Sequence, residues 1–327
     1  MTAQHHFEQI AKRSKRKQLL KTTFFASLLV LSFLLLGIKV LVEITSRNGR
    51  RILERYDYLN QVAYPNIHYK NYYFHSWGLF SGEFISNRVK NIDGIEVPFE
   101  PMRKGYSITQ LTSRDDDSDA YWDSQKTGVY SQGEQLKIPV FYNTRYDYQD
   151  KEINPPITQD LILVNKLPNQ AAEVAITFDK PYSYKEIQGF IPENILINWY
   201  WIGSKGSFDT TDLSVQDTLG IMSFDDGKLS DQAFQQFRHK LEEGVTSLAW
   251  LDNTYGTGND GKSYGVSIKD DAKNYLKHNK TLQKAKFSGI IVSGRTENLA
   301  QLAHHKWIFA SNIGQSVEIQ PYHKLTK

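Results

Sequence analysis

The chain has 327 residues, a formal net charge of +3 and no cysteine. Its charge is uneven, because residues 1–22 hold six basic side chains and one acidic one and carry +5, which leaves −2 for the rest. This balance argues against a nucleic-acid-binding main part. The missing thiols exclude disulfides and thiolate-based zinc or iron–sulfur sites.

A membrane-spanning helix is the first element that the sequence predicts. Residues 22–44 form an apolar run of twenty-three positions with only Lys39 and Glu43 as charges, which is enough to cross a bilayer. A cleavable secretory signal would place small residues just after the apolar run, but IKVLVEITS follows, with bulky branched side chains. We therefore expect an uncleaved span over 23–45, with Lys39 and Glu43 at its edge.

The basic residues around this span predict its orientation. Six lysines and arginines precede the span, and four arginines follow it closely, at positions 47, 50, 51 and 55. Since Lys and Arg concentrate on the cytoplasmic side of a membrane, we expect a short basic cytoplasmic end over 1–22. Nearly all of the remaining chain should then be extracytoplasmic.

The part directly after the span is predicted to begin with a helical stalk over 46–61, where Ile52, Tyr56 and Leu59 recur at helical spacing. Residues 62–158 are rich in Tyr, Phe, Val and Ile, so strands should dominate there. Turn signals break this part at Asp93-Gly94, Pro98, Pro101 and Pro139. Adjacent prolines at 155 and 156 exclude a central strand or helix and indicate a linker.

Beyond the prolines, residues 159–327 alternate between helical and extended patterns. A helix is expected over 230–243, because it begins with a capping serine, has three apolar residues on one face and meets Gly244 as a stop. The stretch FSGIIV at 287–292 predicts a buried strand.

The C-terminal end repeats this alternation. Thr296 is expected to cap a helix that runs to 304, with Leu299 and Leu302 on one face, and residues 307–319 close the chain in extended structure. The patterns together predict an α+β fold. It comprises one N-terminal transmembrane helix, a strand-rich membrane-proximal part and an α+β C-terminal part.

The strand-to-helix connection VSGRTENL admits two interpretations. Backbone N–H groups at a helix start can hold an anion, which Arg295 could assist beside Thr296. The same residues also suit an ordinary connection in which Gly294 makes the turn and Arg295 is solvated.

Other candidate motifs are weaker. The stretch GTGNDG at 256–261 matches G-x-G-x-x-G but leads into an extended pattern instead of a helix, which favours a surface turn. The acidic groups at 115–119 and 225–226 lack the spacing of a calcium loop. No common hydrolase motif occurs, so no catalytic residue, metal or cofactor is expected.

Three aromatic rings are concentrated in INWYWIG at 197–203. In a strand, Trp199 and Trp201 would share one face with Ile197 and leave Tyr200 on the other. Core packing is the first interpretation, and stacking on a glycan or capture of a peptide by the two tryptophans is the second.

Several stretches carry a resemblance to a known family. They are the basic-then-apolar opening, YPN at 64–66, ITFDKPYSYKEI at 176–187, GIIVSGRTENLAQL at 289–302 and ASNIGQSVEIQPY at 310–322. With them the chain resembles the sigma factor regulator family of single-span bacterial membrane proteins. Several members of that family act as anti-sigma factors for extracytoplasmic-function sigma factors. The resemblance begins near Phe7 and is most specific in the C-terminal half.

The resemblance implies a regulatory protein without enzymatic activity, whose outer part senses or scaffolds while its cytoplasmic end restrains a sigma factor. Better-developed members have a longer and often acidic segment before the span, whereas residues 1–22 are basic here. A short helix with Phe7, Ile10 and Ala11 on one face is the candidate partner contact, with its basic run on anionic lipid.

So short a helix is marginal alone. A second membrane protein or a homodimer would therefore have to support the contact with the sigma factor. The other interpretation of this end is a topology signal alone.

Two functions therefore remain open. The first is a membrane-anchored, anti-sigma-factor-like regulator that controls an extracytoplasmic-function sigma factor in response to envelope conditions. The second is an extracytoplasmic binding or scaffold protein of the envelope without direct contact to transcription.

Overall fold

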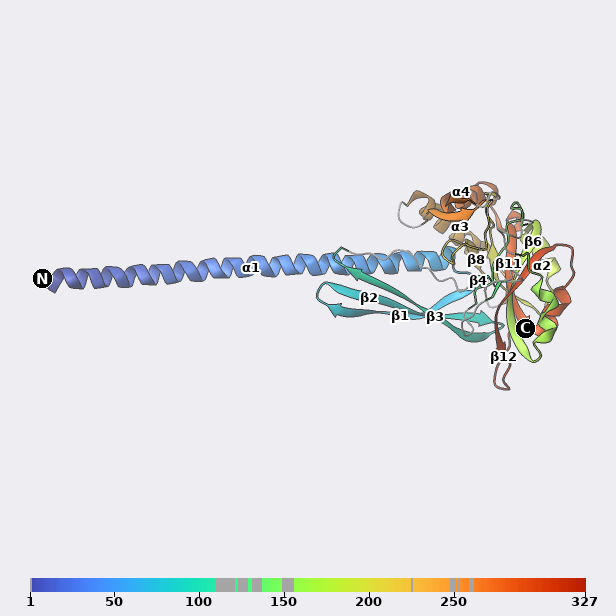
Figure 1. Cartoon of the computed structure of the whole chain (residues 1–327), viewed down its shortest axis with the longest axis horizontal. Coiled ribbons are helices and arrows are strands. Elements are labelled where there is room, and N and C mark those ends of the chain that lie inside the picture. Colours follow the sequence, from blue (N-terminus) through green and yellow to red (C-terminus); the bar gives the residue numbers. More distant parts are fainter. Residues whose placement is uncertain are drawn as a thin grey trace.

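The structure is a computed structural model that describes residues 2–109, 121–122, 129–130, 137–148, 156–224, 226–247, 251, 253–258 and 262–327. Figure 1 shows a very long helix that leads into a head of strands and short helices. The N-terminus lies at the free end of this helix, and the C-terminus lies on the head. The predicted acidic group at 115–119 and the residues Asp225 and Gly261 lie outside the described residues.

Helix α1, Thr2–Val62, is one uninterrupted helix of 61 residues. At 1.5 Å per residue it is about 90 Å long, and the hydrocarbon core of a bilayer is about 30 Å thick. The predicted span and the predicted stalk are therefore consecutive parts of one helix. Within the described chain, α1 is the helix long and apolar enough to cross a membrane, and its most apolar stretch is not buried in the protein.

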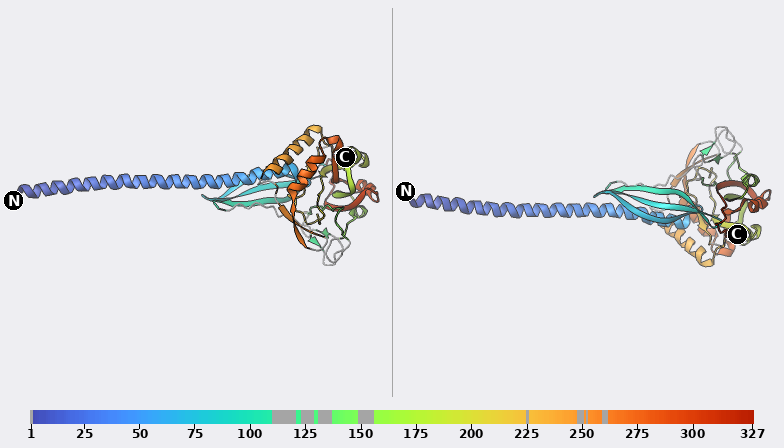
Figure 2. Two further views of the ribbon diagram at one scale, coloured as in Figure 1. Left: turned by 90° about the horizontal axis from the view of Figure 1, so that it is seen from above. Right: turned by 90° about the horizontal axis from the view of Figure 1, so that it is seen from below.

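Three long antiparallel strands follow α1 and lie beside its C-terminal part (Figures 1 and 2). They are β1 Ile67–Gly78, β2 Ser81–Ile92 and β3 Ile95–Ser107, in the order β1-β2-β3. The predicted turn at Asp93 and Gly94 is confirmed, and both residues have positive φ. The prediction that Pro98 and Pro101 break strands is wrong, because both lie within β3, an edge strand, where proline is tolerated.

The head is built on a five-stranded antiparallel sheet in the order β12-β6-β11-β7-β8. Its strands are β6 Gln170–Ser183, β7 Leu196–Trp201, β8 Gly220–Met222, β11 Lys286–Arg295 and β12 Ile308–Glu318. Two small sheets pair β4 Tyr121–Trp122 with β5 Val129–Tyr130, and β9 Asn253–Thr257 with β10 Ser263–Ser267. The predicted strand at 287–292 and the predicted extended C-terminal segment are confirmed as β11 and β12.

Short helices flank these strands. They are α2 Tyr184–Phe190, α3 Asp231–Thr246, α4 Ile268–His278 and α5 Thr296–Leu299, with 3-10 turns at 160–162, 164–166, 282–284 and 300–302. The predicted helix over 230–243 is confirmed as α3, and Ser230 Oγ accepts a hydrogen bond from the Ala233 N–H at 3.1 Å. Gly244 is not a stop, because α3 continues to Thr246. Gly244 instead packs so closely against the Tyr58 ring that no Cβ would fit.

The predicted helix over 296–304 is shorter than expected. Helix α5 ends at Leu299, and a 3-10 turn follows. Thr296 does not cap the helix, because its hydroxyl donates to the Leu167 carbonyl at 2.7 Å and Arg295 occupies the capping position without a side-chain bond. Leu299 and Leu302 are fully buried, as their spacing predicts.

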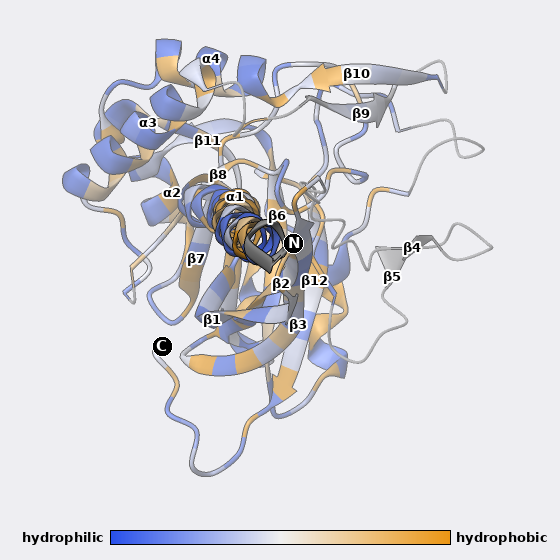
Figure 3. Ribbon diagram, turned by 90° about the vertical axis from the view of Figure 1, so that its left-hand side faces the viewer, coloured by the Kyte–Doolittle hydropathy of each residue, from blue (hydrophilic) through white to orange (hydrophobic). Residues whose placement is uncertain are grey.

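One hydrophobic core joins the end of α1 to the head. It includes Ile52, Tyr56, Leu59 and Val62 of α1, Phe84 and Phe99 of the three-stranded sheet, Phe178 and Ile290 of the five-stranded sheet, and Phe234, Leu241, Leu299 and Leu302 of the short helices. Figure 3 looks along α1 onto the head and shows β2 and β3 on one side of the helix and α3 on another. The last turns of α1 are therefore an internal element of the head.

Candidate functional site

A tight chain reversal at residues 64–66 follows the end of α1. Tyr64 and Asn66 both have positive φ, of 57° and 53°, a conformation that is uncommon for any residue except glycine. The Tyr64 N–H donates to the Val215 carbonyl at 3.1 Å, which ties the reversal to the head. The YPN segment thereby sends β1 back along α1, toward the apolar part of the helix.

Tyr56 joins α1 to the three-stranded sheet. Its ring is 1% exposed and lies 5.5 Å from the ring of Phe84 and 5.9 Å from that of Tyr69, between ring centroids. Ser86 Oγ donates a hydrogen bond to the Tyr56 hydroxyl at 3.0 Å. Aromatic pairs at such distances contribute about 0.5–1.5 kcal/mol each beyond burial, so α1 and the sheet are packed as one unit.

A buried polar junction connects this unit to the five-stranded sheet. It consists of Asn66, Lys90, Glu173 and Gln315, which we call the polar junction. Lys90 of β2 forms an ion pair with Glu173 of β6, and neither side chain is exposed. Asn66 Nδ2 donates to Glu173 Oε2 at 2.8 Å, and the Gln315 N–H donates to Glu173 Oε1 at 3.1 Å. The chain reversal after α1 and the strands β2, β6 and β12 therefore meet at one carboxylate.

Burial dominates the electrostatics of the polar junction. It lowers the pKa of Lys90, because the ammonium is removed from water, and the neighbouring Glu173 carboxylate opposes that shift. Lys90 Nζ also donates to the Lys137 carbonyl at 2.9 Å and lies 5.1 Å from the centre of the Phe99 ring. A buried ion pair of this kind requires such additional partners, since desolvation costs several kcal/mol per ion.

A second set of contacts lies next to the polar junction, at the β2–β3 turn. The Asp93 N–H donates to Ser293 Oγ of β11 at 2.8 Å, and Asn198 Nδ2 of β7 donates to the Asn91 carbonyl at 2.9 Å. The Lys327 N–H donates to Asp93 Oδ1 at 2.9 Å. The far end of the three-stranded sheet is thus fixed to the head and to the C-terminal tail.

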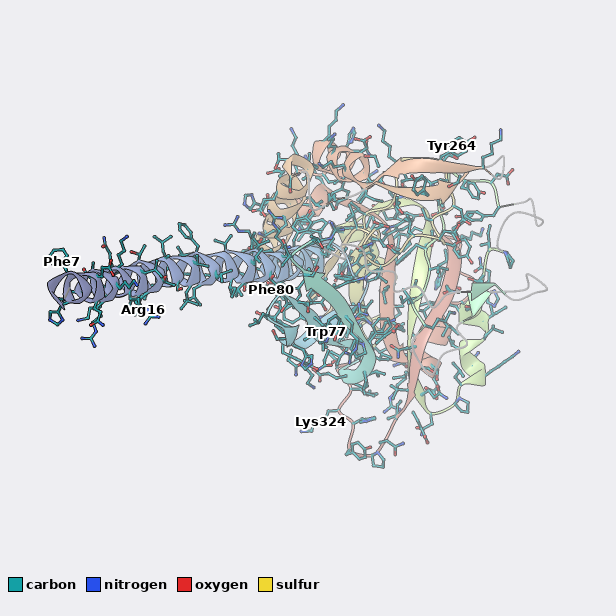
Figure 4. The ribbon with its side chains drawn as sticks, turned by 60° about the vertical axis from the view of Figure 1, so that its left-hand side comes forward. Phe7, Arg16, Trp77, Phe80, Tyr264 and Lys324 are labelled. Atoms are coloured by element: carbon teal, nitrogen blue, oxygen red, sulfur yellow. The ribbon has the colours of Figure 1, made fainter. Side chains whose placement is uncertain are left out.

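The predicted partner-contact residues lie at the other end of α1. Phe7, Ile10 and Ala11 are all exposed, and Phe7 and Ile10 have 78% and 57% of their surface accessible. Their spacing places them on one face of the helix. Figure 4 shows Phe7 and Arg16 on the part of α1 that projects away from the head.

The predicted ligand-contact residues lie on the five-stranded sheet. Trp199 and Trp201 are 0% and 3% exposed and pack on Phe141, whose ring centre is 5.7 Å and 4.8 Å from theirs. Arg295 is exposed at the end of β11, and Thr296 is 1% exposed. The two tryptophans lie together, but Arg295 is separate from them. Trp199 pairs with Ile291 of β11, and Arg295 lies four residues further along that strand.

The predicted grouping of Ile197 with the two tryptophans is wrong. Along β11, Ile291 pairs with Trp199 but Val292 pairs with Ile197, so Asn198 is an extra residue in β7. Such a bulge reverses the faces that side chains take on its two sides. Ile197 therefore packs in the main core with Tyr200, and the tryptophans pack on the opposite face.

The polar junction is the feature that sequence reasoning missed. Two local signals point to it: Glu173 is the one acid in the apolar stretch AAEVAIT, and Lys90 takes an inward position in a strand of alternating residues. Neither signal names the partner, because the two residues lie far apart in the chain. A charged residue in a buried strand predicts that an oppositely charged residue lies nearby, but it does not show where in the sequence that residue is.

These observations indicate a single-pass membrane protein with an α+β head. A helix that is long and apolar enough to span a membrane is consistent with single-pass anchoring, and it continues into an α+β head through a buried junction. Among the described residues, no three His, Asp or Glu side chains are grouped to hold a metal ion.

The chain belongs to the sigma factor regulator family. The sigma factor regulator N-terminal domain matches residues 8–97, and the sigma factor regulator C-terminal domain matches residues 164–315. Neither a curated protein nor a solved structure gives a match. The family is regulatory, and its two domains support an anti-sigma-factor-like regulator that interacts with a sigma factor. Lys90 lies in the N-terminal match and Glu173 in the C-terminal match, so the polar junction joins the two family domains.

Proposed function

We propose that this protein restrains an extracytoplasmic-function sigma factor at the cytoplasmic face of the membrane, and that the head adjusts this restraint to envelope conditions without enzymatic activity. In this proposal residues 1–22 are cytoplasmic and the head is extracytoplasmic. The denser basic run before the apolar stretch supports that orientation.

The continuity of α1 is the observation that carries the proposal. The helix that exposes Phe7 and Ile10 at one end also supplies Tyr56, Leu59 and Val62 to the head core at the other. A helix held by a packed core moves with that core, so a tilt or rotation of the head displaces the cytoplasmic end. This gives a direct route from an event at the head to the sigma factor, because α1 has no break between the two ends.

The contact with the sigma factor is proposed to be weak in a single copy. A helix that exposes only Phe7, Ile10 and Ala11 as its apolar face offers a small surface. A second copy of the chain, or a second membrane protein, would raise the effective concentration of such contacts. The anionic inner leaflet would add about 1 kcal/mol per lysine or arginine and hold the basic run at the membrane.

A reporter strain tests this function. Deletion of the gene should raise transcription from promoters of one extracytoplasmic-function sigma factor, because removal of a binding partner enlarges the free pool of sigma factor. The full-length chain should restore the restraint. The variant Phe7→Asp with Ile10→Asp should restore it poorly, because charge on the apolar face disrupts the contact.

The matched control is Gln9→Asp, which adds a carboxylate to the same turn on the opposite side of α1. This variant should restore the restraint as the unchanged chain does. Equal restraint by the Phe7 and Ile10 variant would reject the contact. Unchanged transcription in the deletion strain, with and without envelope stress, would reject the proposed function. The alternative function, an envelope scaffold without contact to transcription, would then remain.

A further inference from the structure

We propose that the turn between β1 and β2, residues 77–80, is a second membrane contact that enters the interface of the leaflet next to the head. This contact is separate from the span of α1 and does not depend on the proposed sigma factor. It would fix the distance and tilt of the head relative to the bilayer.

The hairpin turn lies at the level where the apolar run of α1 ends. Asn48 Nδ2 donates to the Ser107 and Ile108 carbonyls at 2.8 Å and 3.3 Å. Ser107 pairs with Ser81, which in turn pairs with Gly78. The turn therefore lies beside Asn48, four residues or about 6 Å along α1 from the last residue of the apolar run. Figure 1 shows this end of the hairpin pointing toward the N-terminal half of α1.

Close packing holds the hairpin against α1 at this level. A Cβ built on Gly49 would lie 3.2 Å from the Tyr106 ring and 3.3 Å from the Phe74 ring, so glycine permits the close approach. Thr45, one turn nearer to the apolar run, is only 6% exposed. The turn therefore has a defined height beside the membrane helix.

The side chains of the turn suit a lipid interface. Trp77 is 61% exposed and Leu79 is 68% exposed, although both are large and apolar. Figure 4 shows Trp77 and Phe80 at this end of the sheet. The preceding strand adds the ring of Phe74, which is 41% exposed and lies at the level of Gly49. Trp and Tyr are enriched at the boundary between hydrocarbon and headgroups, and from residue 71 to residue 82 the sequence contains no Asp, Glu, Lys or Arg.

Charged residues on α1 mark the same height. Arg47, Arg50 and Arg51 are exposed directly after the apolar run, and Arg50 forms an ion pair with Glu43 at 2.7 Å. Arginines at this position can reach lipid phosphates. The arginines lie on the face of α1 that points away from the hairpin, and the aromatic turn lies on the other side at the same height. Both therefore meet the same leaflet, which selects lipid over a second protein as the occupant.

Site-specific labelling tests the contact, because the chain has no cysteine of its own. The variant Leu79→Cys carries an environment-sensitive NBD label in full-length protein reconstituted at one copy per nanodisc. Its emission should shift to shorter wavelength, and a nitroxide placed near the headgroup end of the lipid chains should quench it. Trp77→Cys repeats the measurement on the other side of the turn.

Tyr322→Cys is the matched control. Tyr322 is an apolar side chain that is 77% exposed in the C-terminal tail, which is held at the opposite end of the hairpin by the contacts of Asp93 with Thr326 and Lys327. Its label should keep the emission of a solvated dye and escape lipid quenching. Equal lack of quenching at 77, 79 and 322 overturns the proposal. A blue-shifted label at 79 that lipid nitroxide does not quench also overturns it, because a protein surface would then cover the turn.

Discussion

Lys90 and Glu173, which lie 83 residues apart in the chain, form a fully buried ion pair between two strands. The lysine belongs to the sheet that packs on the membrane helix, and the acid belongs to the sheet of the head. The pair therefore lies where the two family domains meet, beside the hydrophobic core that also joins them.

Removal of one member of this ion pair should reduce the stability of the protein. Glu173→Gln leaves the Lys90 ammonium buried without a countercharge, and we expect a loss of about 3–5 kcal/mol in the free energy of unfolding. Chemical unfolding of the purified full-length protein measures this loss. Glu96→Gln is the control, because the Lys70–Glu96 pair has 58% of each side chain exposed and should contribute no more than about 1 kcal/mol.

A paired substitution separates charge from packing at the polar junction. Lys90→Met with Glu173→Leu removes both charges and keeps similar volumes, so it should recover most of the stability that Glu173→Gln loses. If the double variant is as unstable as the single one, the hydrogen bonds of Asn66 and Gln315 outweigh the charge pair.

Leu299 tests the packing of the C-terminal domain. It is fully buried after β11, and Leu299→Ala should reduce the free energy of unfolding by about 2–5 kcal/mol through lost burial and a cavity. Thermal unfolding of the full-length protein measures the loss. Leu163→Ala changes a leucine that is 40% exposed and should have a much smaller effect; equal losses would contradict the burial of Leu299.

Asp209 predicts a dependence of stability on pH. The residue is 3% exposed, and burial together with the charge of Asp212 raises the pKa of its carboxyl from 3.8 to about 6. Because the folded state binds the proton more tightly, Asp209 stabilises the fold below pH 4 and this contribution is lost as the pH rises to 6. A difference of that size corresponds to about 3 kcal/mol.

The variant Asp209→Asn isolates this effect. An amide oxygen can still accept the hydrogen bonds from Thr211 and Tyr148, but it does not titrate. Relative to the unchanged protein, the variant should gain stability as the pH is raised from 4 to 6. Parallel stability curves for the two proteins over this range would show that the carboxyl is not the titrating group.

The orientation of the chain is open to a labelling test with single cysteines. Ser14→Cys lies in the basic run, and Tyr322→Cys lies on the head. A membrane-impermeant maleimide should label Tyr322→Cys on intact spheroplasts and should label Ser14→Cys only after permeabilisation. The reverse pattern would place the head in the cytoplasm.

Local patterns predicted much of the fold. The apolar run, the helical spacing of Ile52, Tyr56 and Leu59, and the Asp93-Gly94 turn each depend on neighbouring residues, and each corresponds to an observed element. The helix predicted after β11 is longer than the observed one, and the local patterns predict neither α2 nor α4. At helix boundaries, tertiary bonds such as that of Thr296 to Leu167 overrule local capping preferences.

The contacts between distant segments could not be predicted in the same way. The bulge at Asn198 depends on how β7 registers with β11, and the ion pair of Lys90 depends on where β6 packs. No local pattern encodes either relationship. The same limit applies to the hairpin turn at 77–80, whose exposed aromatic residues acquire meaning only from their height beside α1.

The shared core also constrains how the chain is made. Glu173 accepts its last hydrogen bond from Gln315, and the core around the end of α1 includes Leu302. During synthesis α1 is complete long before these residues leave the ribosome, so the head closes onto a helix that is already present. Chains that stop short of β12 would leave Glu173 without this partner and expose the apolar surface of a half-built head. The addition of β12 is therefore the last step of assembly, and protein quality control should recognise chains that lack this strand.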